Sequence, residues 1–155
     1  MSNFYTPDGA ALSSNRMEWR TPPQLFKELD AEFHFTLDAA ASPANALCPR
    51  FLSADGMDAF STPWTGRVFC NPPYGRDAGR WIARIAHEAA TSADIVVALL
   101  PARTDTAAFH AYLYNRPGVS LRFLRGRLRF GNPDTGLPCA PAPFPSMVAI
   151  LRAPK

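Results

Sequence analysis

The stretch RVFCNPPYGRDAGRWIARIAHEAATSADIVVALLP, residues 67–101, decides the fold class. Its first four residues, Arg67–Cys70, are typical of a buried strand, and the Pro-Pro pair that follows soon after cannot continue a β-ladder. Asp77 can then cap a helix to about Thr91, and Asp94–Leu100 is a continuous apolar run of the kind found in buried parallel strands. A strand, a helix and a second strand joined by short loops predict an α/β domain with a mainly parallel sheet.

The same alternation extends toward the N-terminus. Thr21 can cap a helix whose first residue is Pro22 and which runs to about Phe33. Residues 34–38 then alternate polar and apolar like a strand. We expect this strand to stop in the small-residue turn at 39–42.

Shorter elements complete the domain. Residues 43–65 are expected to be loop with one short strand near residues 48–52. The remaining expected elements are a helix capped by Thr104 and running to about Tyr114, strands at 119–124 and 146–151, and a short strand or turn at 127–130.

Length and composition indicate one globular domain. The chain has 155 residues, of which 47% are hydrophobic and 19% charged, and this excludes a disordered or collagen-like chain. We expect a flexible N-terminal arm over residues 1–17 and the domain over 18–155. Three cysteines without a CxxC pair predict reduced thiols in a cytoplasm rather than a disulfide framework or a zinc site. No apolar run is long enough to span a membrane, and no signal-type segment precedes the domain.

Positive charge is concentrated near the C-terminus. Residues 1–115 carry 9 basic and 12 acidic side chains, whereas residues 116–155 carry 7 basic and one acidic. This asymmetry indicates a polyanionic partner or, equally, a solvated arginine-rich surface.

The most informative short motif is Asn71-Pro72-Pro73-Tyr74, directly after a predicted buried strand. Ligands of such sheets bind at the carboxyl ends of the strands. The Asn71 side chain and the stiff proline turn offer carbonyl acceptors, and Tyr74 offers a flat ring. These features suit the binding of an exocyclic amino group on a planar ring. The same residues could instead form a proline-rich surface turn.

The order of motifs along the chain resembles the small phage and prophage DNA N6-adenine methyltransferase family. The Asn-Pro-Pro-Tyr turn is similar to the catalytic motif of S-adenosylmethionine-dependent amino methyltransferases, and the resemblance covers about residues 18–151. The segments that carry it are Glu18-Trp19-Arg20-Thr21-Pro22, Phe35 to Ser42 with Asn45 and Cys48, Asp58-Ala59-Phe60 with Trp64, the Asn-Pro-Pro-Tyr turn, Leu100 to Thr104, and Leu124 to Phe130.

The resemblance implies a single-domain, Rossmann-like methyltransferase fold without a separate target-recognition domain. It also implies S-adenosylmethionine as cofactor and DNA as partner, with no metal. The residues that it implies for the cofactor are Thr21, Pro22, Asp38, Ala39, Ala40, Asp58, Phe60 and Asn71. Asp38 is expected to accept from the cofactor's α-ammonium group and Asp58 from its adenine amino group, although either aspartate could instead cap a turn. The usual glycine-rich turn is replaced by residues 39–42, and only Asp55 is a candidate for the ribose.

The expected reaction is methyl transfer to the N6 amino group of adenine in DNA. Asn71, Pro72, Pro73 and Tyr74 would form the catalytic turn, and the base would have to be flipped out of the duplex to reach it. Arg103, Arg125, Arg127 and Arg129, together with Tyr74, are the expected DNA-binding residues. The last three arginines could instead pair with acids such as Asp77 or Asp105. Two alternatives remain open. The acceptor could instead be N4-cytosine, RNA or a protein glutamine, or the chain could be an inactive nucleic-acid-binding remnant.

Overall fold

The structure is a computed structural model that describes residues 4–5, 11–12, 19–53 and 58–154. Most of the arm expected over residues 1–17 lies outside the described residues, as does Asp55. The elements in chain order are β1 (Phe4–Tyr5), β2 (Ala11–Leu12), α1 (Pro23–Phe33), β3 (Leu37–Ala41), β4 (Phe51–Ser53), α2 (Asp58–Ser61), β5 (Gly66–Cys70), α3 (Ala78–Thr91), β6 (Ala93–Pro101), the π-helix η1 (Phe109–Leu113), β7 (Val119–Phe123) and β8 (Ser146–Leu151).

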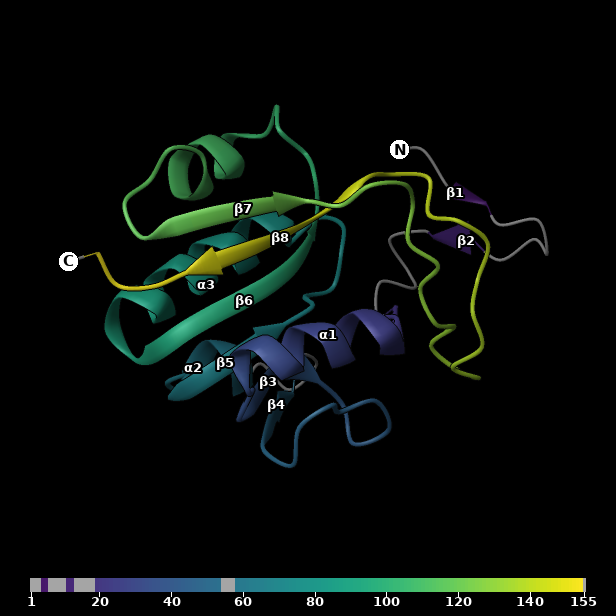
Figure 1. Cartoon of the computed structure of the whole chain (residues 1–155), viewed down its shortest axis with the longest axis horizontal. Helices are drawn as coiled ribbons and strands as arrows, with labels where there is room; N and C mark the ends of the chain where they lie inside the picture. Colours follow the sequence, from purple (N-terminus) through teal and green to yellow (C-terminus); the bar gives the residue numbers. More distant parts are fainter. Residues whose placement is uncertain (1–3, 6–10, 13–18, 54–57, 155) are drawn as a thin grey trace.

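Six strands form one mixed sheet in the order β4-β3-β5-β6-β8-β7 (Figure 1). The pairings β3·β4, β3·β5 and β5·β6 are parallel. β8 runs antiparallel to both of its neighbours, β6 and β7. The prediction of a compact α/β domain is confirmed, but the sheet is not purely parallel, because the last strand enters between two strands that share a direction.

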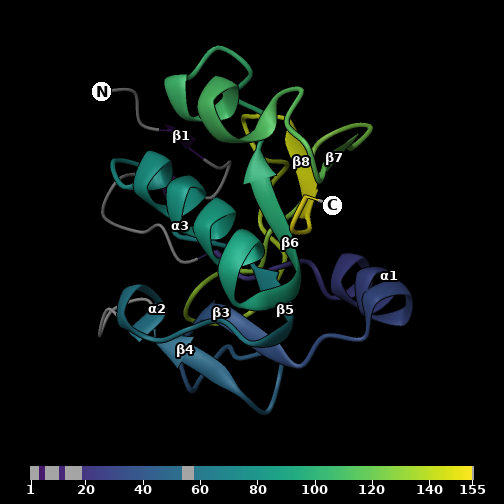
Figure 2. The same ribbon diagram turned by 90° about the vertical axis from the view of Figure 1, so that its left-hand side faces the viewer.

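Strand alternation divides the core between the two faces of the sheet. Val96, Ala98 and Leu100 of β6 belong to one cluster, which includes α3, and we call this side the α3 face. Val97 and Leu99 point the other way, into a cluster with Leu29 and Phe33 of α1, which we call the α1 face. Figure 2 shows α1 and α3 on opposite sides of the sheet.

Residues from the C-terminal third complete the α1 face. Phe130, Cys139, Ala142 and Phe144 are buried there, although they belong to no helix or strand. Figure 1 shows that the chain between β7 and β8 runs beyond the ends of these strands, and its buried residues belong to the same core cluster as α1.

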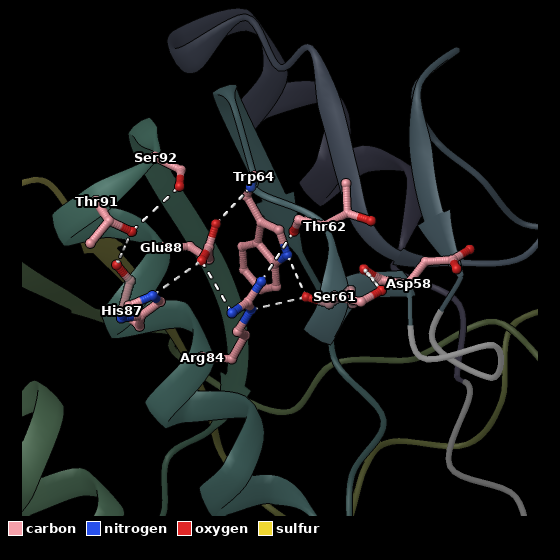
Figure 3. A network of polar contacts seen from close by, with 10 residues as sticks. Asp58, Ser61, Thr62, Trp64, Arg84, His87, Glu88, Thr91 and Ser92 are labelled. Carbon is pink, nitrogen blue, oxygen red and sulfur yellow. Dashed lines mark hydrogen bonds and ion pairs between the residues drawn. The ribbon is translucent and has the colours of Figure 1, made fainter.

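A buried carboxylate joins α2 to α3 on the α3 face (Figure 3). Glu88 is 2% exposed, accepts a hydrogen bond from the Trp64 backbone N–H at 2.7 Å, and pairs with Arg84 at 3.3 Å. The Trp64 indole N–H and Arg84 Nε both donate to the carbonyl of Ala59. This network explains why α2, which the sequence did not predict, is held in place despite its single turn.

Local structure differs from the sequence-based expectation at several points. Pro22 rather than Thr21 is the residue before α1, and Pro23 is its first residue. β3 does not stop before residue 39 but continues through Ala41, because β4 pairs with it as far as Ala41 and Ser53. The expected cap at Thr104 is replaced by Thr106, whose hydroxyl accepts from the Phe109 N–H.

The structure confirms the expected positions of α3 and β6 and shows no strand at residues 127–130. α3 and β6 begin and end close to the predicted residues, although Asp77 makes no side-chain capping bond. Residues 127–130 form no strand. Within the described residues, no helix is long and apolar enough to cross a membrane.

Candidate functional site

A cavity of about 270 Å³ lies at the carboxyl ends of β3 and β5. Strand alternation explains which side chains reach it. Asp38 of β3 pairs in register with Phe69 of β5, and both side chains face the α1 side of the sheet because their neighbours Leu37, Ala39, Val68 and Cys70 belong to the α3 face. Asn71 stands two residues after Phe69 and therefore faces the same way. All three residues line the cavity.

The Asn71 side chain is held by three hydrogen bonds. Its Nδ2 donates to the carbonyl oxygen of Trp19 and to the hydroxyl of Thr21, each at 3.0 Å. Its Oδ1 accepts from the Tyr74 hydroxyl at 2.9 Å. Both amide hydrogens are thus used, whereas an amide oxygen has two lone pairs and only one of them is occupied by Tyr74. The arrangement fixes an acceptor at the edge of the cavity.

Thr21 therefore has a different local role from the predicted one. Its side chain is buried and its hydroxyl accepts from Asn71 rather than capping α1. Pro23 disfavours the helical conformation at the residue before it, and Pro22 is extended, with a ψ of 127°. α1 therefore begins at Pro23, and Thr21 lines the cavity.

Tyr74 joins the catalytic-type turn to the aromatic cluster of the α1 face. Its ring meets Phe130 and Phe144 edge-on, with centroid distances of 5.8 and 5.5 Å. Burial raises the pKa of the Tyr74 phenol well above its ordinary value. The phenol is accordingly a neutral donor to Asn71, and its ring keeps part of its surface exposed.

Asp38 is a carboxylate in a nearly closed environment, with 3% of its surface exposed. Its Oδ1 accepts from the Ala40 N–H at 3.3 Å and its Oδ2 from the Leu47 N–H at 3.1 Å. Burial outweighs these two bonds and raises the pKa of Asp38 from 3.8 to about 6. A cation placed against this group would offset its desolvation, so the carboxylate is suited to an ammonium ligand.

Arg20 and a C-terminal loop also line the cavity. Arg20 and Gly131 exchange two backbone hydrogen bonds, at 3.0 and 2.8 Å. The Arg20 guanidinium donates from Nη2 to the carbonyl of Pro133 at 3.1 Å. Gly136 adopts a φ of +74° beside it, and a Cβ there would stand 3.0 Å from Arg20 Nη1. The loop at 131–138 is therefore fitted around this one side chain.

The cavity brings together some of the residues predicted for the cofactor and for the catalytic turn, but not others. Thr21, Asp38, Ala40, Asn71 and Pro73 line it. Pro22, Ala39, Pro72 and Tyr74 adjoin these residues in the chain without lining the cavity. Asp58 and Phe60 lie elsewhere, in α2 on the α3 face, where Phe60 packs edge-on against Trp81 at 4.6 Å and beneath Arg80 at 4.0 Å.

The four predicted DNA-binding arginines are exposed side chains of the C-terminal half. The Arg103 guanidinium lies 6.0 Å from the ring of Phe144, which itself contacts Tyr74. Arg129 donates to the carbonyl of Cys139 at 3.5 Å. Among the described residues, neither Arg127 nor Arg129 pairs with Asp77 or Asp105, so the structural alternative considered for them does not hold in that form.

Sequence reasoning did not assign three groups that the structure places at the cavity. These are Arg20, the segment at 44–47, and the glycines at 131 and 136. Arg20 belongs to the quoted segment Glu18-Trp19-Arg20-Thr21-Pro22, but that segment did not single it out. The positive φ of Gly136 is known only from the structure. No cluster of three or more His, Cys, Asp or Glu side chains suited to a metal ion occurs in the part of the chain that the structure describes.

Comparison with known proteins places these features in a family. The model of the family described as DNA N-6-adenine-methyltransferase (Dam) matches residues 8–155, nearly the whole chain. No curated protein matches the sequence.

Proposed function

Because the chain belongs to the DNA N-6-adenine-methyltransferase (Dam) family, we propose that it transfers a methyl group from S-adenosylmethionine to the N6 amino group of adenine in DNA. Family membership implies this activity in general terms, and the geometry of Asn71 supports its assignment to a particular site. The proposal includes a Rossmann-like reading of the sheet, supported by its consecutive parallel strands and a cavity at their carboxyl ends.

The observation that carries the proposal is the fixed Asn71 amide. Its Nδ2 is held by two acceptors, so its Oδ1 cannot rotate away from the turn, and one lone pair of Oδ1 remains for a new donor. An adenine N6 amino group donates two hydrogens. We propose that Asn71 Oδ1 and the backbone carbonyl of Pro72 accept them.

These acceptors favour attack by the N6 lone pair. In free adenine this lone pair is delocalised into the ring, which makes the amino group a poor nucleophile. Hydrogen bonds that hold both N–H groups stabilise the tetrahedral nitrogen and the positive charge that develop as the new N–C bond forms. The catalytic effect is then mainly positioning and electrostatic stabilisation. The half-buried Tyr74 ring is proposed to stack against the flipped base.

The other part of the cavity fits the amino-acid end of the cofactor. Asp38 is a buried carboxylate whose pKa is raised by desolvation, and it therefore favours a cationic partner. When bound, S-adenosylmethionine would supply an electrophilic methyl group: its bond to the sulfonium sulfur would break as the N–C bond forms, the electron pair would stay on the sulfur, and the methylated amino group would lose one proton to water. The role of the chain is to hold that methyl group in line with N6, with Asp38 at the ammonium end and Asn71 at the acceptor end.

The direct test is transfer of tritiated methyl groups from S-adenosylmethionine to unmethylated DNA, followed by digestion and separation of the nucleosides. We expect label in N6-methyl-2′-deoxyadenosine, and a rate lowered about 100-fold or more in Asn71→Ala. Gln24→Ala is the matched control, since it removes an exposed amide from α1. Label in cytosine, in RNA or in protein would assign a different acceptor, and no transfer by the wild type would refute the proposal.

A further inference from the structure

An exposed leucine stands next to the cavity in the chain. Leu137 is 67% exposed, the highest fraction among the large hydrophobic side chains that the structure describes. It directly follows Gly136, which lines the cavity together with Gly131 and Asn71. We infer that Leu137 enters the DNA duplex when the target adenine leaves it, fills the gap in the base stack and so holds the base in the flipped position. This inference rests on the proposed function.

The first argument is that the loop at 131–138 holds Leu137 at the surface. The loop is a short hairpin, closed by a β-bridge between Gly131 and Pro138. The Leu137 carbonyl accepts from the Asn132 N–H at 2.8 Å, and the Leu137 N–H donates to the hydroxyl of Thr135 at 3.2 Å. Because both backbone groups of Leu137 are engaged, its exposure is fixed by the hairpin.

The turn of the same hairpin is fixed by two further groups. Asn132 Oδ1 accepts from the N–H groups of Asp134 and Thr135, at 2.8 and 3.2 Å. The Arg20 guanidinium donates to the carbonyl of Pro133 at 3.1 Å. The hairpin is therefore preorganised, and DNA can bind to it without first ordering a loop.

The second argument is what the proposed reaction requires. A flipped base leaves a gap between its neighbours, and the lost pairing and stacking favour its return to the duplex. Leu is one of the side chains that proteins insert between base steps, and an exposed apolar group leaves water when it does so. Such a side chain has to stand beside the pocket that receives the base. Leu137 meets this condition through Gly136, since the proposed acceptor Asn71 lines the same cavity.

The third argument is the charge around the hairpin. Residues 116–155 carry seven basic side chains and one acidic side chain. Arg127 and Arg129 are exposed on the segment that leads into the hairpin, whereas Leu128 and Phe130 pack into the core of the α1 face. Positive charge beside an exposed apolar side chain suits a duplex, in which phosphates surround stacked bases.

The test compares two synthetic duplexes. One is centred on an adenine that the wild type methylates, and the other has an abasic site in place of the partner thymine. Removing the partner removes the pairing that opposes flipping, so methylation of the second duplex depends less on Leu137. We expect Leu137→Ala to lower kcat/KM for DNA about tenfold on the paired duplex and by less than about threefold on the abasic duplex. Affinity for S-adenosylmethionine should not change, and Leu137→Met, which keeps a long apolar side chain, should retain most of the wild-type rate.

Phe123→Ala is the matched control. Phe123 is 59% exposed, and it lies on the other face of the sheet because it pairs with Met147 of the α3-face core. It should behave like the wild type on both duplexes. Equal losses on the two duplexes in Leu137→Ala, no loss on either, or the same pattern in Phe123→Ala would overturn the inference. Failure of the wild type to methylate adenine in any DNA would refute the proposed function, whereas the outcomes above refute only the role of Leu137.

Discussion

Replacing Asp38 by Asn should stabilise the fold at neutral pH while it weakens the proposed cofactor site. Burial raises the pKa of Asp38 from 3.8 to about 6, so the folded chain binds the Asp38 proton more tightly than the unfolded chain does. Asn has nearly the same shape as that acid and carries no charge. The variant therefore removes the cost of burying a carboxylate at neutral pH.

The sign and size follow from proton linkage. Between about pH 4 and pH 6 the unfolded chain has released the Asp38 proton and the folded chain still holds it, so wild-type stability falls as pH rises. A difference of about two pKa units corresponds to about 3 kcal/mol, spread over this window. The Asn amide loses one of the two N–H donors that Asp38 accepts, which costs about 1 kcal/mol at every pH.

The assay is urea unfolding of the ligand-free chain from pH 4 to pH 8 for the wild type and Asp38→Asn. We expect the variant to be slightly less stable than the wild type near pH 4 and about 2 kcal/mol more stable near pH 7.5. Asp94→Asn, which removes an exposed carboxylate at the start of β6, is the control for loss of a negative charge. Parallel stability curves for the wild type and Asp38→Asn, or the same divergence in Asp94→Asn, would refute the reasoning.

Three further predictions concern the rest of the molecule. Tyr74→Phe removes the hydroxyl that donates to Asn71 Oδ1 but keeps the ring, so kcat should fall about tenfold with little change in cofactor affinity. An unchanged kcat would mean that this hydrogen bond has no part in catalysis. Arg127→Ala and Arg129→Ala should each lower the slope of log DNA affinity against log salt concentration by about one and leave cofactor affinity unchanged. Fluorescence titrations at several salt concentrations measure this slope. Unchanged slopes would place the phosphate contacts elsewhere, with Arg103 the next candidate. Glu88→Ala should cost about 1–3 kcal/mol of unfolding free energy, because it leaves the buried Trp64 N–H without an acceptor. Glu28→Ala, at an exposed position of α1, should cost much less. Equal losses in urea unfolding would contradict the role given to the buried network.

The sequence by itself determined the elements whose signals are local. The apolar run of β6, the periodicity of α3 and the proline pair after β5 each lie within a window of a few residues, and each element begins and ends close to its predicted position. The same local pattern predicted the Asn71–Tyr74 turn as a candidate site, because a stiff turn after a buried strand is visible in the sequence.

Elements that depend on distant partners could not be read in this way. The small residues Ala39–Ala41 suggested a turn, yet β4 supplies backbone partners that extend the strand as far as Ala41, which pairs with Ser53. β8 carries an apolar run like that of β6, and only its place between β6 and β7 makes it antiparallel. Strand direction is a property of the pairing, and a single strand's composition does not contain it.

The site shows the same division. Asn71 and Asp38 were chosen from the sequence, but the bonds that orient them come from Trp19, Thr21 and Leu47. Arg20 carries no local signal that separates it from other arginines in the chain. It lines the cavity because a loop more than a hundred residues later pairs with its backbone and accepts from its guanidinium. Local residue patterns determined which chemistry is present, and tertiary pairing decided which charges share one cavity.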